Sequence, residues 1–296
     1  TDEDSENQVN QSYSPTVVGN SFGSFPAAWV THALGDRSYY SHELRLSGSI
    51  GDRIDWIVGG FFYNEESENS GRNIMETDFD FDGGRSEDET AFFGAVEFAV
   101  TDQFNLGVEA KRSERDIAAD LANNGKTGDD VSKSEDDVQW RVTADYLLDS
   151  GLLLYANAGR GTKAGGFNSA IDPNDPVEAP FFEYDPEEAT QYEIGFKADL
   201  DGRGHITGAV FRTDLTDQQL SQVVILREGT PQQTQETVVL NVGESEIVGF
   251  ELDGAYEFTD NLTLGASWAM ADSEITEGSD STHGGIVGSD DLAGFK

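Results

Sequence analysis

The sequence has no cysteine, few basic residues and no long hydrophobic run. The absence of cysteine from the 296 residues excludes a disulfide-stabilised scaffold and thiolate metal sites. The 18 Lys and Arg stand against 57 Asp and Glu, which gives a formal net charge of -39. Because such a chain cannot neutralise a phosphate backbone, nucleic acid is excluded as a partner. The acidity suits a surface that is solvated in salty water or that attracts cations.

No stretch approaches the ~20 apolar residues that a membrane-spanning helix needs. The longest apolar runs, residues 152–156 and 223–226, have the length of strands. A hydrophobic fraction of 36% still argues against a chain that is disordered throughout. Residues 1–6 are polar and acidic, unlike a signal peptide. We therefore expect the chain to be a piece of a longer precursor.

Alternation of apolar and polar residues dominates what is present. In residues 190–199, Tyr192 and Ile194 alternate with Glu193 and Lys197, which is the period of a β-strand. A soluble sandwich would hide the apolar face of such a strand in a core. A membrane barrel instead turns that face to lipid and the charged face to a wet lumen.

The connections between the alternating segments favour the barrel. The connections near residues 52, 102, 150, 201 and 260 are turns of about two to six residues, whereas the others usually have about 20 or more, as in outer-membrane barrels. Soluble sandwiches distribute long loops over both ends. The sequence therefore predicts an all-β fold, an antiparallel transmembrane β-barrel that is partial, with about 10 or 11 strands, short periplasmic turns and long extracellular loops.

One barrel domain is expected across residues 1–296. Residues 1–40 are predicted to be an extracellular loop, residues 41–271 the barrel hairpins, and residues 272–296 a second extracellular loop. Polar segments without a strand period are predicted to be loops as well: residues 64–89, 113–137 and 162–185.

Five segments carry a family resemblance. Residues 155–168 read YANAGRGTKAGGFN, and residues 192–200 read YEIGFKADL. The others are HELRLSG at residues 42–48, WIVGGFFYNEE at residues 56–66, and VGFEL followed by LTLGASWAMADSEI between residues 248 and 275. In this order they resemble the barrel of TonB-dependent outer-membrane receptors, in which an arginine-glycine pair is followed by a basic residue and Gly-Gly-Phe-Asn.

The resemblance implies a cell outer membrane receptor that takes up a scarce solute, such as an iron-siderophore complex, cobalamin or an oligosaccharide. It implies substrate binding by extracellular loops and a plug domain, with energy supplied through the periplasmic protein TonB. The sequence shows no plug, no TonB-engaging box and no terminal aromatic strand. We therefore expect part of a barrel that contacts outer-membrane lipid, with TonB engaged through a region outside this chain.

Polar residues on the strands are candidates for a site in the lumen or at its rim: Arg141, Arg160, Lys163, Glu193 and Lys197. They form either a substrate path or plug-docking surface, or only the solvated lining of a lumen with cross-strand ion pairs. Arg160 and Lys163, beside Gly165 and Gly166, are the candidates for a functional basic spot near the extracellular rim.

A calcium-loop pattern begins at Asp78. Asp78, Asp80 and Asp82, with Glu89 in the twelfth position, fit D-x-D-x-D-G-x5-E. The carboxylates would converge on Ca²⁺, and Glu89 would chelate it with both oxygens. Arg85 stands where that loop usually carries an aliphatic residue, and the alternative is an acidic, solvated loop. No cofactor is required, and Ca²⁺ is the one that the sequence suggests.

No enzyme is predicted. The four histidines are scattered without metal-ligand spacing, and no Gly-x-Ser-x-Gly elbow occurs. The alternative function is a secreted, acidic, all-β binding or adhesion protein that binds calcium, which would be monodisperse in plain buffer. A passive diffusion porin is disfavoured by the receptor-like segments.

Overall fold

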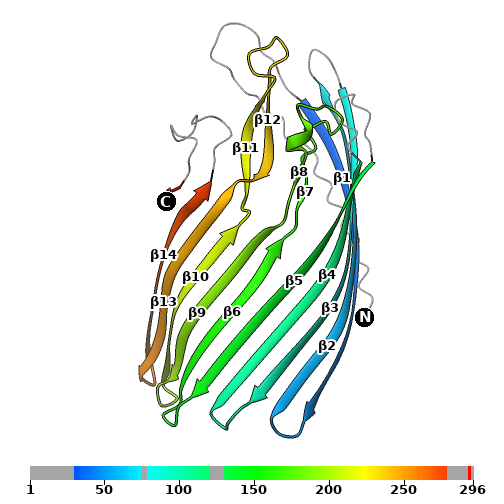
Figure 1. Ribbon diagram of the computed structural model, residues 1–296. Coiled ribbons are helices and arrows are strands. Elements are labelled where there is room, and N and C mark those ends of the chain that lie inside the picture. Colours follow the sequence, from blue (N-terminus) through cyan, green and yellow to red (C-terminus); the bar gives the residue numbers. More distant parts are fainter. Residues whose placement is uncertain (1–29, 75–78, 121–129, 279–292, 295–296) are drawn as a thin grey trace.

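A computed structural model describes residues 30–74, 79–120, 130–278 and 293–294. Ten strands form one antiparallel sheet in the order β1-β2-β3-β4-β5-β6-β9-β10-β13-β14 (Figure 1). The two edges of this sheet are β1 and β14, so the sheet is open. The prediction of an antiparallel all-β fold with about ten barrel strands is confirmed.

The strands of the large sheet are longer at its N-terminal side. They are β1 Val30–Ile50, β2 Ile54–Ile74, β3 Phe79–Ala99, β4 Phe104–Asp120, β5 Asp130–Leu147, β6 Leu152–Lys163, β9 Glu187–Asp199, β10 Gly204–Thr216, β13 Gly243–Thr259 and β14 Leu262–Gly278. Two small pairs and a 3-10 turn complete the described chain: β7 Gly166–Phe167 with β8 Glu183–Tyr184, β11 Gln219–Leu226 with β12 Thr234–Asn241, and η1 Ala179–Phe181. No helix in the described residues is long and apolar enough to cross a membrane.

The large sheet has one apolar and one polar face. The register aligns Val96, Val108 and Val142 across β3, β4 and β5, and these side chains are 47%, 54% and 41% exposed. At the next position the register aligns Glu109 with Arg141 on the opposite face. We call the apolar side the outer face and the polar side the inner face. A contiguous exposed apolar surface marks contact with a membrane or a partner.

The height of the apolar surface fits a lipid bilayer. On β5 the outer-face side chains from Val138 to Tyr146 include Trp140, Val142 and Ala144. At about 3.3 Å per residue this stretch is about 26 Å long, and a strand tilt of about 40° leaves roughly 20 Å across the membrane. Outer-membrane barrels carry an apolar band of about 25 Å.

At one end of the sheet the strands are joined by tight turns, as predicted. Residues 51–53, 100–103, 148–151, 200–203 and 260–261 make these connections. Asp201 and Gly202 adopt positive φ values of 57° and 69° in one of them, which favours Gly, Asn and Asp. We call this the short-turn end and the opposite one the long end.

Several predicted loops are wrong in large part, because the strands at the long end continue into them. Strand β2 extends to Ile74 and β3 begins at Phe79, so most of residues 64–89 is a hairpin. Residues 113–137 likewise contain the ends of β4 and β5. Residues 30–40 belong to β1 and residues 272–278 to β14. The predicted loop at residues 1–29 lies outside the described residues.

Polar side chains on both faces hide the strand period in these extensions. The backbone ladder nevertheless continues, and cross-strand ion pairs accompany it. Arg37 Nη2 lies 2.5 Å from Glu65 Oε2, and Arg112 Nη2 lies 3.2 Å from Asp136 Oδ1. Opposite charges on facing strands stabilise a sheet by ~0.2–1 kcal/mol per pair. Backbone pairing therefore extends beyond the apolar band.

Candidate functional site

A compact assembly stands at the long end of the sheet, and we call it the cap. It consists of residues 164–185, which carry β7, η1 and β8, and residues 217–243, which carry the β11–β12 hairpin (Figure 1). Its apolar core comprises Ile171, Phe182, Val224, Leu226 and Val238, each at most 5% exposed. These are five of the seven buried hydrophobic residues in the described part of the chain. The cap therefore has a core of its own.

Asn168 joins the two halves of the cap. Its Nδ2 donates hydrogen bonds of 2.8 Å to the carbonyl oxygens of Phe181 and Val239, and its Oδ1 accepts one of 2.8 Å from the Val239 N–H. The Asn168 side chain is buried, so these bonds are the means by which its amide is satisfied. The Asn of the Gly-Gly-Phe-Asn segment therefore has a structural role.

Two amide side chains fix the base of the β11–β12 hairpin. Gln219 Nε2 donates to the carbonyl oxygens of Ala164 and Asp185 at 2.8 and 2.9 Å. Asn241 Nδ2 donates to those of Asp185 and Asp217 at 2.8 Å each. Asp217, with φ of 52°, separates β10 from β11. The hairpin and residues 164–185 are thus held together at the base and at the core.

Arg227 closes the far end of the cap. Its guanidinium forms an ion pair with Asp175, and its Nη1 donates to Glu178 Oε1 at 2.8 Å. Asp175 Oδ1 also accepts a 2.8 Å hydrogen bond from the Val177 N–H. This N–H and then Arg227 hold the pKa of the Asp175 carboxyl below its ordinary value.

The two glycines of the family-like segment allow the cap to pack on the sheet. A Cβ at Gly165 would lie 2.4 Å from the carbonyl oxygen of Tyr184 and 2.5 Å from Glu135 Oε1, and one at Gly166 would lie 2.5 Å from Tyr184 Oη. Lys133 Nζ donates to the Tyr184 carbonyl at 3.0 Å and to Asp185 Oδ1 at 2.8 Å. Glycine at both positions therefore permits contacts that any side chain would obstruct.

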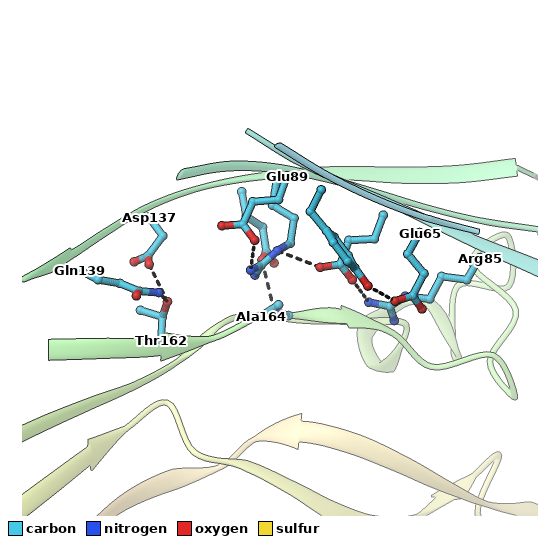
Figure 2. A network of polar contacts seen from close by, with 12 residues as sticks. Glu65, Arg85, Glu89, Asp137, Gln139, Thr162 and Ala164 are labelled. Atoms are coloured by element: carbon cyan, nitrogen blue, oxygen red, sulfur yellow. Dashed lines mark hydrogen bonds and ion pairs between the residues drawn. The ribbon is translucent and has the colours of Figure 1, made fainter. Parts of the chain in front are cut away.

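An ion network lies on the inner face beside the cap (Figure 2). Glu89 of β3 is buried, with Lys111 Nζ 2.6 Å from its Oε1 and Arg115 Nη2 3.3 Å from its Oε2. Arg115 Nε lies 2.9 Å from Glu87 Oε1, and Arg85 Nη2 lies 3.2 Å from Glu87 Oε2. Charges of both signs thus neutralise one another along β3 and β4.

A second set of polar contacts joins β5 to β6. Thr162 donates a 2.6 Å hydrogen bond to Asp137 Oδ2 and accepts one of 3.3 Å from Gln139 Nε2. Figure 2 shows these three side chains directed toward one another, near Ala164 at the start of the cap. The inner face of β5 is therefore tied to the segment that leads into the cap.

The structure gives the calcium prediction no support. Asp78 lies outside the described residues, and β3 continues through Asp80, Asp82 and Glu89. At about 3.3 Å per residue an extended strand puts Glu89 roughly 30 Å from Asp80, so the compact loop that the motif requires is not formed. Among the described residues no three Asp, Glu or His side chains are placed to hold a metal ion. Calcium binding by this segment stays a prediction.

Two predicted lumen residues line one groove of the inner face. Arg141 Nη2 donates to Glu109 Oε1 at 2.5 Å, and Glu193 accepts a 3.4 Å hydrogen bond from Asn157 Nδ2. The groove has a volume of ≈ 940 Å³, and Lys111 also lines it. Its walls carry both positive and negative side chains, so the groove can contact another polar protein surface or a polar solute.

The other three predicted residues have different surroundings, although Arg160 also lines this groove. Lys197 Nζ lies 5.3 Å from the centre of the Tyr155 ring, in a cation–π contact. Arg160 borders the groove, but the register pairs it with Trp140 on the face opposite to Arg141. Lys163 ends β6 at the base of the cap. The five residues therefore form no single cluster, and the predicted basic spot is divided between the outer face and the cap.

Sequence reasoning missed the core of the cap and the clamp at Arg227. A signal for the core was present in the apolar run at residues 223–226 and in Phe181 and Phe182, which lie between polar segments. The partners of Asn168 and Arg227 are up to 71 residues away, and a single sequence does not reveal them.

Comparison with known proteins decides the family. The model of the TonB dependent receptor-like β-barrel matches residues 1–293. The chain belongs to this family. TonB-dependent receptors are proteins of the outer membrane, so the short-turn end is periplasmic, the long end is extracellular and the outer face contacts lipid. The secreted soluble alternative has no support.

Curated relatives of this chain are named as siderophore, metal-pseudopaline and pesticin receptors. Over 134 residues it is 33% identical to the probable TonB-dependent siderophore receptor PiuA of Acinetobacter baumannii, a match that covers 45% of this chain and 16% of PiuA. Over 257 residues it is 26% identical to the pesticin receptor of Yersinia enterocolitica, covering 83% of this chain and 35% of that protein. The chain thus spans about a third of that relative's length. These relatives are receptors, not enzymes.

Solved structures show the same fold. The ferric yersiniabactin uptake receptor FyuA from Yersinia pestis matches with a TM-score of 0.69 and 20% identity, over 85% of this chain and 38% of that one. The copper transporter OprC matches with a TM-score of 0.66 and 20% identity, over 82% and 38%. The open ten-stranded sheet is accordingly part of a barrel.

Replacement of Asn168 by alanine is expected to loosen the cap. The substitution leaves the N–H and carbonyl of Val239, which are partly buried, without their Asn168 partner, which costs about 1–3 kcal/mol. Hydrogen exchange at the Val239 amide of the intact receptor should accelerate by roughly 10- to 100-fold. The control is Ser169→Ala, at an exposed neighbour. Equal exchange in both variants would contradict the role assigned to Asn168.

The Asp175 carboxyl is expected to titrate below the ordinary aspartate pKa of about 3.9. Because its pKa is lowered in the folded protein, its contribution to cap stability is present above the unfolded pKa and is lost as the pH falls through the folded one. Carboxyl ¹³C NMR of the intact receptor measures the midpoint. Arg227→Gln should raise it only part of the way, since the Val177 N–H remains, and Arg203→Gln at a periplasmic turn should not move it. A wild-type midpoint at or above the ordinary value would refute the clamp.

Proposed function

We propose that this chain is part of an active importer of metal chelates, and that the cap contributes to the extracellular surface that first binds the chelate. The observation that supports this proposal is the family match over residues 1–293. Among the substrates that the sequence left open, a chelate is favoured over cobalamin or an oligosaccharide. Several similar proteins are named as siderophore, metal-pseudopaline or ferric yersiniabactin receptors, and one as a copper transporter.

The cap has the construction of a binding surface. Binding residues are often carried on loops that a rigid scaffold positions, and here two long connections share one apolar core and are bonded to β5 through Lys133. A loop assembly that is already ordered loses less conformational entropy when a ligand binds. The polar tip around Asp175 and Arg227 offers charges of both signs to a metal complex.

The inner face is proposed to line the path of the solute or to seat a plug. Arg141 and Glu193 line the groove of ≈ 940 Å³, and Lys197 lines one of ≈ 480 Å³ nearer the periplasmic turns. Their charges are partly satisfied within the sheet, as the Arg141–Glu109 pair shows. This arrangement supports a solvated lining more than a selective binding site. TonB would act through a region outside this chain.

Uptake by cells tests the proposal. A strain that lacks the intact receptor should fail to accumulate radioactive iron supplied as a chelate that the wild type imports, and a plasmid copy should restore uptake. Removal of TonB or collapse of the proton gradient should abolish uptake while leaving chelate binding at the cell surface. Uptake that persists without TonB would identify a passive pore instead.

A further inference from the structure

The outer-face residues of β4 change from apolar to charged at one position along the strand. From the periplasmic side its outer-face residues are Leu106, Val108 and Ala110, then Arg112, then Glu114. A single arginine therefore separates the lipid-contacting part of the strand from its acidic extracellular extension. Such a position, at the end of an apolar band, lies at the depth of lipid headgroups.

Strand β10 repeats this order. Its outer-face residues are Ile206, Gly208 and Val210, then Arg212, then Asp214. Because the two strands are separated by three others in the sheet, no local repeat accounts for the agreement.

The cross-strand neighbours of both arginines are exposed and apolar. Arg112 lies between Phe92 and Val138, which are 72% and 46% exposed. Arg212 is likewise between Tyr192 and Val248, both exposed. Each arginine is thus set into the extracellular edge of the lipid-contacting surface.

The two arginines lie at the same height. From Arg212 the register leads through Tyr192, Ala158 and Val142 to Val108 on β4. Arg112 is four residues nearer the extracellular end than Val108, after four strand-to-strand steps. A strand tilt of about 40° shifts a level line by about one residue per strand, given spacings of about 4.8 and 3.3 Å, so four steps account for the offset of four residues. The strands lean in one common direction (Figure 1).

Both guanidinium groups retain hydrogen-bond donors. The Arg112 side chain is 71% exposed, and it donates one N–H to Asp136 at 3.2 Å. The Arg212 side chain is 54% exposed. Its Nε and Nη2 both lie 2.8 Å from Asp214 Oδ1, and its Nη2 is also 2.7 Å from Glu246 Oε2, so Nη1 is the nitrogen that retains its donors. All three carboxylates stand on the extracellular side of their arginine, where they orient the guanidinium.

Arg160, on the strand midway between them, differs. Its Nε and Nη2 are engaged by Glu188 and its Nη1 by the carbonyl oxygen of Val138, so all three nitrogens have protein partners.

We propose that Arg112 and Arg212 bind phosphate groups of lipids in the outer leaflet of the outer membrane. A guanidinium presents paired N–H donors that match phosphate oxygens, and it does so here at headgroup height. In a chain of net charge -39, an anionic headgroup is repelled by most of the surface, and the remaining N–H groups of these two arginines offer it hydrogen-bond donors. The inference depends on the membrane location and not on the transported solute.

Native mass spectrometry of the intact receptor in detergent, titrated with phosphatidylglycerol, tests the proposal. Replacement of each arginine by glutamine should weaken binding roughly fivefold, the equivalent of about 1 kcal/mol per basic residue near a lipid surface. The Arg112→Gln/Arg212→Gln variant should combine both losses. The Arg112→Lys/Arg212→Lys variant keeps the positive charges but loses the paired N–H donors of the guanidinium. It should bind more tightly than the double glutamine variant and less tightly than the wild type.

Two controls separate phosphate recognition from general lipid contact. Arg141→Gln, on the inner face, should bind phosphatidylglycerol as the wild type does. A galactosyl diacylglycerol, which has no phosphate, should bind the wild type and the double glutamine variant equally. The retention of the compact form on unheated gels confirms that each variant is folded. If the double variant does not fold, the two single variants are titrated with the same lipids instead. Unchanged phosphatidylglycerol affinity after loss of the arginines, or an equal loss in Arg141→Gln, would overturn the proposal.

Discussion

The need to pair every backbone N–H and C=O group governs this structure. In the hydrocarbon part of a bilayer, no water is present to satisfy them, so a sheet has to continue until it closes. Each of the ten strands accordingly pairs with its neighbours along the sheet, and the tight periplasmic turns keep the register. The open edges at β1 and β14 are those of a partial barrel, as the matches to about two fifths of the chains of solved receptors indicate.

At the extracellular end, backbone pairing between strands continues beyond the bilayer. The strands β1–β5 continue beyond the apolar band, where water is available and pairing is no longer obligatory. Ion pairs such as Arg37–Glu65 and Lys111–Glu89 accompany them there. The same end carries the cap, which uses the ordinary means of a soluble domain, a small apolar core and buried hydrogen bonds. Two kinds of stabilisation thus meet at the headgroup level, near Arg112 and Arg212.

The sequence was a good guide wherever one face of a strand is apolar. The alternation around Tyr192 and Ile194 and the turns near residues 52 and 201 predicted the hairpins, because period and turn chemistry are local properties. The same rule failed at Glu65 to Glu68 and at Glu87 to Glu89, where both faces are polar and only backbone pairing defines the strand. The structural roles of Gly165, Gly166 and Asn168 were not predicted, since their partners at Tyr184 and Val239 are set by tertiary structure.

The most direct test of this account asks which medium each face of the sheet contacts. Since the chain has no cysteine, single cysteines at Ile194 and Val210 on the outer face and at Glu193 on the inner face can be spin-labelled in the intact receptor in lipid bilayers. The account predicts that labels at Ile194 and Val210 are relaxed by dissolved oxygen and that the label at Glu193 is relaxed by a water-soluble nickel chelate. Equal accessibility of all three to the nickel chelate would contradict a membrane-spanning sheet.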